Sequence, residues 1–179
     1  MSTPHSTAEE IRQAIAQGPL TAEYQADPQH IIEELNRLRA AELASYLQYQ
    51  QHAYMAVSLL APGLKEQFTA HAAVELQHAD VLGARSQQWG GVPVFSPAEI
   101  SAKAAEVGTR PEQGATLSEL VSENVVMERR QVAAYTALIR EIGGKDPTTR
   151  HLLTGILVEK ERHVSELAGY LRATAETRR

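Results

Sequence analysis

Cysteine is absent from this chain of 179 residues. Without thiols the protein can form no disulfide, and iron–sulfur ligation and thiolate zinc sites are excluded. No apolar run approaches the length of a membrane-spanning helix. The segment Met1 to His5 lacks the basic and apolar regions of a secretory signal peptide. We therefore expect a cytoplasmic protein with no membrane partner.

Aromatic residues are scarce as well, at 5% of the chain, and runs of β-branched residues are nearly missing. Long stretches are instead rich in Ala, Leu, Glu, Gln and Arg, which favour helix. With 43% hydrophobic residues the chain can bury a core, and its length suits one domain. A net charge of -5 argues against a general nucleic-acid binder, since it does not balance phosphates. These features predict an all-α fold.

Local signals divide the chain into an arm and four long helices. Asp27-Pro28 and Asp146-Pro147 each place an acidic N-cap before a proline at the first helical position. Thr116 and Glu119 form a capping box, and Gly or Pro follows the predicted helix ends. The predicted helices cover residues 27–58, 64–89, 116–142 and 146 almost to the C-terminus.

The links between these helices indicate how the chain folds. Two short links predict two antiparallel hairpins, and the long link over residues 90–115, with a short helix over 97–107, can cross the length of a bundle. We predict an antiparallel four-helix bundle with one long crossover over residues 27–179. Residues 1–26 form an N-terminal arm, either with a short helix over 7–17 or as a disordered tail. The apolar face of that helix would be Ile11, Ala14 and Ile15.

Each long helix carries a stripe at three- and four-residue spacing that is apolar at both ends and polar in the middle. Such a stripe faces a bundle core, where a carboxylate is costly unless it is paired or bound to metal. One buried histidine is ordinarily satisfied by hydrogen bonds, but that explanation is poor for five polar residues in register. The residues in question are Glu42, Glu75, His78, Glu128 and His163.

An internal repeat relates the two hairpins. Tyr49 follows Glu42 by seven residues and Tyr135 follows Glu128 by seven, so each tyrosine lies on the face of its glutamate. The repeat predicts a duplicated half-site and hence a two-metal centre. Carboxylates and imidazoles without thiolates suit iron or manganese, with zinc a further candidate. The tyrosines either hydrogen-bond the ligands or fill the core.

These motifs resemble the ferritin-like superfamily, in particular bacterioferritin and its shorter, Dps-like relatives, over about residues 28–175. The resemblance implies iron binding, oxidation of ferrous iron by oxygen or peroxide, and iron storage or detoxification. It implies Glu42 and His78 as terminal ligands of one metal, and Glu128 and His163 as those of the other. Glu75 would bridge the two metals.

Lys160 is the main departure from the family pattern, which has a glutamate three residues before the last histidine. The stripe of the fourth helix turns Lys160 inward. Three carboxylates and one ammonium balance one divalent cation rather than two. The hypothesis is a centre that is mononuclear, weakly occupied or metal-free, with reduced ferroxidase activity. An inward lysine also tends toward a depressed pKa, which leaves a neutral amine ligand as the less favoured alternative.

Other departures concern haem and assembly. Leu76 stands where bacterioferritin has its haem-ligating methionine, so we expect no haem. The sequence after His163 is too short for the family's fifth helix, which argues against a 24-subunit shell and leaves a dimer or a smaller shell as the expected homo-oligomer. His52 and His71 also lie on the stripes, as hydrogen-bonded core residues or as further metal-binding residues.

Two alternative functions follow from the sequence. The small residues Ala41, Ala44, Ser45 and Ala72 could leave an apolar pocket beside the metals, as an oxygen- or peroxide-activating oxidase of an organic substrate requires. A DNA-protecting protein of the Dps type would need a basic tail. Only the small cluster Arg172, Arg178 and Arg179 is present, so we expect no nucleic-acid partner.

Overall fold

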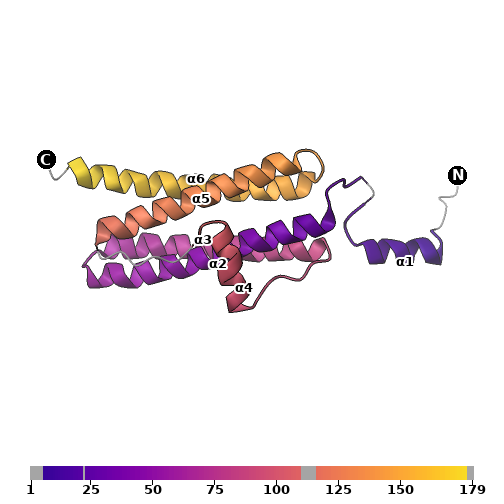
Figure 1. Ribbon diagram of the computed structural model, residues 1–179, viewed down its shortest axis with the longest axis horizontal. Helices are drawn as coiled ribbons and strands as arrows, with labels where there is room; N and C mark the ends of the chain where they lie inside the picture. Colours follow the sequence, from indigo (N-terminus) through magenta and orange to yellow (C-terminus); the bar gives the residue numbers. More distant parts are fainter. Residues whose placement is uncertain (1–5, 22, 110–115, 177–179) are drawn as a thin grey trace.

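The computed structural model describes residues 6–21, 23–109 and 116–176, and in this part of the chain every element is a helix. Figure 1 shows two long hairpins side by side, with a short helix beside them and another beyond one end. The helices are α1 (Ala8–Gln17), α2 (Pro28–Ser58), α3 (Pro62–Gln88), α4 (Pro97–Glu106), α5 (Leu117–Ile142) and α6 (Pro147–Glu176). The predicted all-α class is confirmed, and the helix ends lie within about two residues of the prediction.

Helix starts follow the capping residues of the sequence. The side chain of Asp27 accepts a hydrogen bond from the backbone N–H of Gln29, at 3.1 Å. Thr116 and Glu119 form the expected reciprocal capping box at the start of α5. Asp146 accepts the backbone N–H of Thr149 at 2.9 Å. These bonds satisfy amide groups that have no partner inside the helix, so the boundaries are encoded locally.

The helices pair as two antiparallel hairpins, α2 with α3 and α5 with α6 (Figure 1). The connection between α3 and α5 carries α4, which packs across α2. Asn36 of α2 fixes the start of this connection by bonding the Val92 carbonyl and the Val94 N–H, each at 3.1 Å. The part of the connection over residues 110–115, with the predicted Pro111 and Gly114, lies outside the described residues, as do Arg178 and Arg179.

Two apolar clusters fill the bundle, one toward each end. One contains Leu35, Leu82 and Leu153, and the other contains Phe68, Leu120 and Leu167. Between them lies a layer of buried polar and charged side chains. The apolar clusters shield this layer from solvent along the bundle axis, which strengthens electrostatic interactions within it.

Residues before α2 are attached to the bundle, whereas α1 is not. The Tyr24 ring packs edge-on against Trp89 with 5.8 Å between centroids, and its hydroxyl lies 3.0 Å from that of Thr148. The predicted short helix is present as α1, but Ile11 and Ile15 on its apolar face are exposed. Within the described residues no helix combines the length and apolar character needed to span a bilayer.

Candidate metal centre

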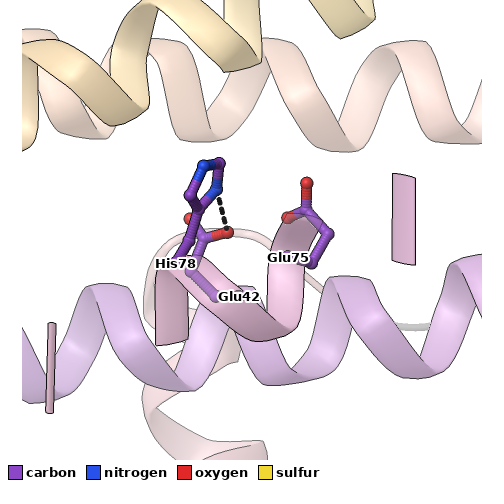
Figure 2. A group of neighbouring side chains, drawn as sticks. All are labelled: Glu42, Glu75 and His78. Carbon is purple, nitrogen blue, oxygen red and sulfur yellow. Dashed lines mark hydrogen bonds and ion pairs between the residues drawn. The ribbon is translucent and has the colours of Figure 1, made fainter. Parts of the chain in front are cut away.

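The polar layer is built by one or two side chains from each long helix. Glu42 comes from α2, Glu75 and His78 from α3, and Glu128 from α5. Lys160 and His163 come from α6. All six are buried, and His78 is the most accessible of them at 7%. The structure therefore brings together every residue that the sequence predicted for the site (Figure 2 shows three of them).

Two groups of donors are close enough to hold a metal ion. Glu42, Glu75 and His78 form one group, and Glu75, Glu128 and His163 form the other. Within each group the ligand atoms lie within 4.8 Å of one another. Glu75 belongs to both groups, which is the position a bridging ligand requires.

The two tyrosines cross between the hairpins. Tyr49 of α2 donates its hydroxyl to Oε1 of Glu128 at 2.7 Å, and Tyr135 of α5 donates to Oε1 of Glu42 at 2.6 Å. Burial raises the pKa of both phenols well above the usual range, and the neighbouring carboxylates raise it further. The hydroxyls therefore stay protonated as donors. Both tyrosines contact the candidate ligands and also fill the apolar core, so the features of both interpretations are present.

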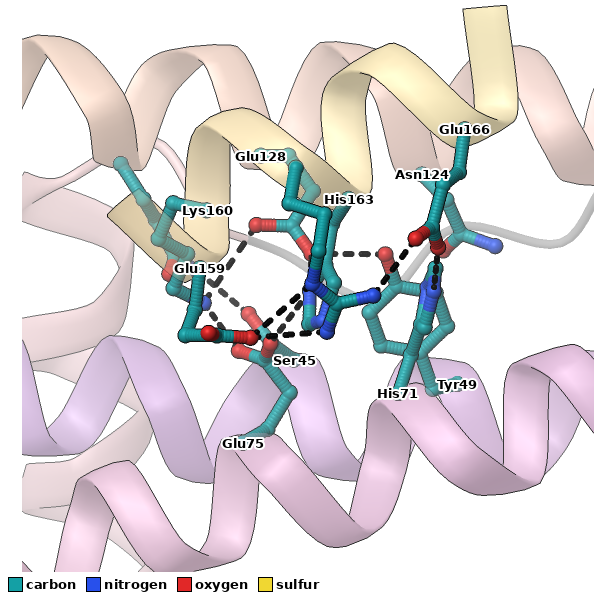
Figure 3. A network of polar contacts seen from close by, with 12 residues as sticks. Ser45, Tyr49, His71, Glu75, Asn124, Glu128, Glu159, Lys160, His163 and Glu166 are labelled. Carbon is teal, nitrogen blue, oxygen red and sulfur yellow. Dashed lines mark hydrogen bonds and ion pairs between the residues drawn. The ribbon is translucent and has the colours of Figure 1, made fainter. Parts of the chain in front are cut away.

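Lys160 reaches into the middle of the carboxylates (Figure 3). Its Nζ lies 2.8 Å from Glu42 Oε2 and 3.4 Å from Glu128 Oε2, and it donates a hydrogen bond to Glu75. In the sequence, Lys160 stands at the position of a glutamate that the family pattern places beside His163, in the half of the centre formed by Glu128 and His163. In the structure it contacts the carboxylates of both halves, because it lies opposite the shared Glu75.

These contacts set the charges of the centre. Burial alone would lower the pKa of Lys160, but Glu128, Glu42 and Glu75 outweigh it and raise that pKa above its ordinary value. The expected depressed pKa is therefore wrong for this lysine, and a neutral amine ligand is disfavoured. Burial favours the neutral acids, yet the ammonium holds the pKa of Glu42 and of Glu128 below the usual value.

Glu75 differs from the other two glutamates. Burial raises its pKa well above the usual value, and the nearby charge of Glu128 raises it further. Since the pKa values of Glu42 and Glu128 are lowered and that of Glu75 is raised, Glu75 is the carboxyl of the three that most readily holds a proton in the metal-free centre. The protein thus holds a carboxyl that can become a ligand by losing that proton.

Unpartnered atoms show where the centre can accept an ion. Oε1 of Glu75 and Oε2 of Glu128 are buried and accept no hydrogen bond from any described residue. Their nearest charged neighbours are looser contacts, Nδ1 of His163 at 3.3 Å from the first and Nζ of Lys160 at 3.4 Å from the second. Both oxygens of Glu42 are engaged, one by Tyr135 and the other by Lys160. Buried polar atoms nearly always have a hydrogen-bond partner, so two carboxylate oxygens without one in the same group suit a cation. The group of Glu75, Glu128 and His163 therefore fits a metal better than the group containing Glu42.

The remaining stripe histidines have carboxylate neighbours. Nε2 of His71 lies 3.0 Å from Oε2 of Glu166, and Nε2 of His52 lies 3.5 Å from Oε2 of Glu123. The sequence interpretation did not include Glu166, although it lies three residues after His163 and hence on nearly the same face of α6.

A cavity of about 720 Å³ lies between α2 and α4. Of the four small residues expected to line a substrate pocket, only Ala44 borders it. Ala41, Ser45 and Ala72 are completely buried. None of the candidate ligands lines this cavity, so it does not supply the substrate pocket that an organic oxidase needs beside its metals.

A four-helix bundle with one crossover and a buried glutamate–histidine centre is the ferritin-like arrangement. The family model for the ferritin-like domain matches residues 32–177, and the chain belongs to this family. The nutrient stress-induced DNA-binding protein of Synechococcus sp. is 31% identical over 148 residues, or 79% of this chain and 80% of that relative. A solved dodecameric thioferritin, the bacterioferritin-related protein of Bacteroides fragilis, is 25% identical with a TM-score of 0.78, covering 96% of this chain and 97% of its own.

Proposed function

We propose that this protein takes up and stores iron as a homo-oligomer, and that each bundle centre holds one metal ion because Lys160 fills the place of a second. Membership of the ferritin-like family supports iron as the cargo. The observation that carries the single-ion claim is the contact of one buried ammonium with Glu42, Glu75 and Glu128.

Charge favours one ion over two. With all three carboxyls ionised the centre carries about −2, from three carboxylates and one ammonium, which balances one divalent cation. In the metal-free state Glu75 carries a proton, and an arriving ion displaces it. A second ion would leave excess positive charge in a region closed to water, which is costly.

The ion binds in the group of Glu75, Glu128 and His163, where two carboxylate oxygens accept no hydrogen bond. The Tyr49 hydroxyl donates a hydrogen bond to Oε1 of Glu128 and so orients the carboxylate toward the ion. Lys160 stays in contact with Glu42, and its positive charge balances that carboxylate in the group of Glu42, Glu75 and His78.

Iron is the substrate of this centre as well as the cargo of the assembly. Ferrous iron loses one electron when it is oxidised, whereas reduction of peroxide to water consumes two electrons and two protons. A centre with one ion supplies one electron at a time, so we expect slower oxidation than at a two-ion centre.

Assembly into a homo-oligomer is supported by the dodecameric neighbour and by unpartnered apolar surface. Exposed apolar side chains occur on α1, at Ile11 and Ile15, and on α2, at Leu47. Leu76, which replaces the haem-ligating methionine of bacterioferritin, is 40% exposed on α3, and we propose that the assembly carries no haem. Nucleic acid is not among the proposed partners, although the name of the Synechococcus relative says that that protein binds DNA.

The experiment is iron loading of the purified protein in air. We expect one oligomeric species by light scattering after size exclusion, and iron that co-elutes with it in large excess over the number of subunits. A Glu75→Gln and Glu128→Gln double variant should load more slowly, while the exposed Glu161→Gln should match the natural protein. A monomer that retains no iron would contradict the proposal.

A further inference from the structure

His71 lies flat against the ring of the candidate ligand His163. The two imidazole rings are nearly parallel, with 3.9 Å between their centroids and 15° between their planes. His71 comes from α3 and His163 from α6, so the stack joins the two hairpins beside the centre. Figure 3 shows His71 between Glu166 and the polar layer. His71 is not a member of either group of candidate ligands, yet it contacts one of them over the whole face of the ring.

One nitrogen of His163 faces the centre, and the other has no partner. Nδ1 lies 3.0 Å from Oε1 of Glu128 and 3.3 Å from Oε1 of Glu75, on the side where the ion would bind. Nε2 is buried and has no hydrogen-bond partner among the described residues. A histidine that ligates a metal ordinarily donates its second ring N–H to a carboxylate, a carbonyl or water, which fixes the orientation of the ring. No described residue does this for His163, so the orientation of its ring needs another restraint.

His71 is itself held in place on the side toward solvent. Its Nε2 lies 3.0 Å from Oε2 of Glu166, and Arg162 donates to the other oxygen of that carboxylate at 2.6 Å. The ring of Tyr49 stands nearly perpendicular to that of His71, with 5.2 Å between centroids. These contacts fix the plane of the His71 ring. A fixed flat ring restrains the ring stacked on it, because rotation of His163 out of the parallel arrangement would press its edge into His71.

We propose that His71 is a positioning residue for the ion of the bundle centre: its ring holds the ring of His163 in the plane that points Nδ1 at the carboxylates. The inference rests on the proposed function. The stack takes the place of the hydrogen bond that Nε2 of His163 does not make. Glu166 acts one step further out, by anchoring His71. His71 does not share the ion with His163, since the in-plane lone pairs of two stacked rings cannot converge on one ion.

The experiment measures Co²⁺ binding to full-length variants, because the visible absorption spectrum of bound cobalt reports the geometry of its ligands. His71→Leu fills the space without a flat ring, whereas His71→Phe restores a flat ring without a nitrogen. We expect His71→Leu to bind Co²⁺ in the centre about tenfold more weakly and with a changed spectrum. His71→Phe should recover most of the affinity and the natural spectrum. Glu166→Ala should weaken binding by less than His71→Leu does, and the exposed Glu161→Ala should have no effect.

Crystal structures of the same variants without metal provide a second readout. In His71→Leu the ring of His163 should turn away from the carboxylates or take two orientations, and in His71→Phe it should keep one. Natural affinity and spectrum in His71→Leu, an unmoved His163 ring in that variant, or equal losses of affinity in His71→Leu and His71→Phe would overturn the proposal. A natural protein that binds no Co²⁺ in its centre would contradict the proposed function instead, and the ring orientations would still decide the role of His71.

Discussion

Nζ of Lys160 lies 2.8 Å from Oε2 of Glu42, and both side chains are completely buried. The same ammonium contacts Glu75 and Glu128, so one positive charge from α6 lies against acidic side chains from the other three long helices. This places a cation belonging to the protein itself where the family resemblance leads one to expect metal ions. The predictions below follow from that arrangement and from the contacts around it.

Lys160→Met should destabilise the metal-free protein by about 3–5 kcal/mol, because it leaves buried carboxylates without their shared cation. Urea unfolding in the presence of a chelator measures this change. Lys65→Met, which removes an exposed ammonium on α3, should change stability by no more than about 0.5 kcal/mol. Equal stability of the Lys160→Met and natural proteins would show that the ammonium does not neutralise the layer.

Lys160→Glu should raise the metal content of the centre by one ion per subunit. The substitution turns the charge of the centre from about −2 to about −4, which balances two divalent cations, and it supplies a carboxylate opposite Glu75. Metal analysis after loading and buffer exchange, compared with Lys160→Gln, measures the effect. An unchanged metal content in the Lys160→Glu protein would mean that something other than Lys160 limits the occupancy.

Metal binding should release close to one proton per ion and should strengthen as pH rises. Glu75 is protonated in the metal-free centre because its pKa is raised, and the ion requires its ionised form. Calorimetric titration in two buffers with different ionisation enthalpies gives the number of protons released. Glu75→Gln has no proton to lose, so its titration should show no buffer dependence at this site; buffer-independent binding by the natural protein would contradict the assignment.

Acid should destabilise the metal-free protein partly through His71. Burial and the charge of His163 lower the pKa of His71 to about 4, against an ordinary value of 6.5. Between pH 6.5 and 4, His71 is protonated in the unfolded chain but neutral in the folded protein. The free energy of unfolding therefore falls as pH drops from 6.5 toward 4, by up to about 3 kcal/mol. Chelator-treated His71→Gln should show a shallower loss of unfolding free energy across this range. The same slope in both proteins would assign the acid sensitivity to other groups.

The buried pair of Arg85 and Asp146 should anchor the second hairpin to the first. Two hydrogen bonds of 3.0 and 3.1 Å join them, and Trp89 donates to the same carboxylate. Asp146→Ala leaves a buried guanidinium unpaired and removes the N-cap of α6, so we expect a loss of about 3–5 kcal/mol. Arg85→Ala should cost a similar amount, and the double variant less than the sum. Additive losses in denaturant titrations would show that the two residues act independently.

The sequence predicted the helices well because their signals are local. Asp27 and Thr116 cap helices with neighbouring residues, and the spacing of Glu42 and Glu128 within their stripes places them inside any bundle that buries those stripes. The layer of buried polar side chains follows from the same periodicity. These features require no knowledge of how the hairpins pack.

What the sequence could not supply depends on contacts between helices. The repeat placed Tyr49 on the face of Glu42, but its hydroxyl bonds Glu128 of the other hairpin. The sequence correctly predicted that Lys160 points into the bundle. Its contacts with the carboxylates of both halves of the centre, however, depend on the register of α6 against α2 and α3. Likewise, only the packing of α3 on α6 pairs His71 with Glu166. Side-chain reach and helix register decide these partnerships, and neither is encoded by spacing along one helix.

The most direct measurement is an anomalous difference map at the iron edge from crystals loaded with ferrous iron without oxygen. Within the centre we predict one peak, among Glu75, Glu128 and His163, with the Lys160 ammonium still against Glu42. Two fully occupied peaks, with Lys160 displaced from the carboxylates, would contradict the account.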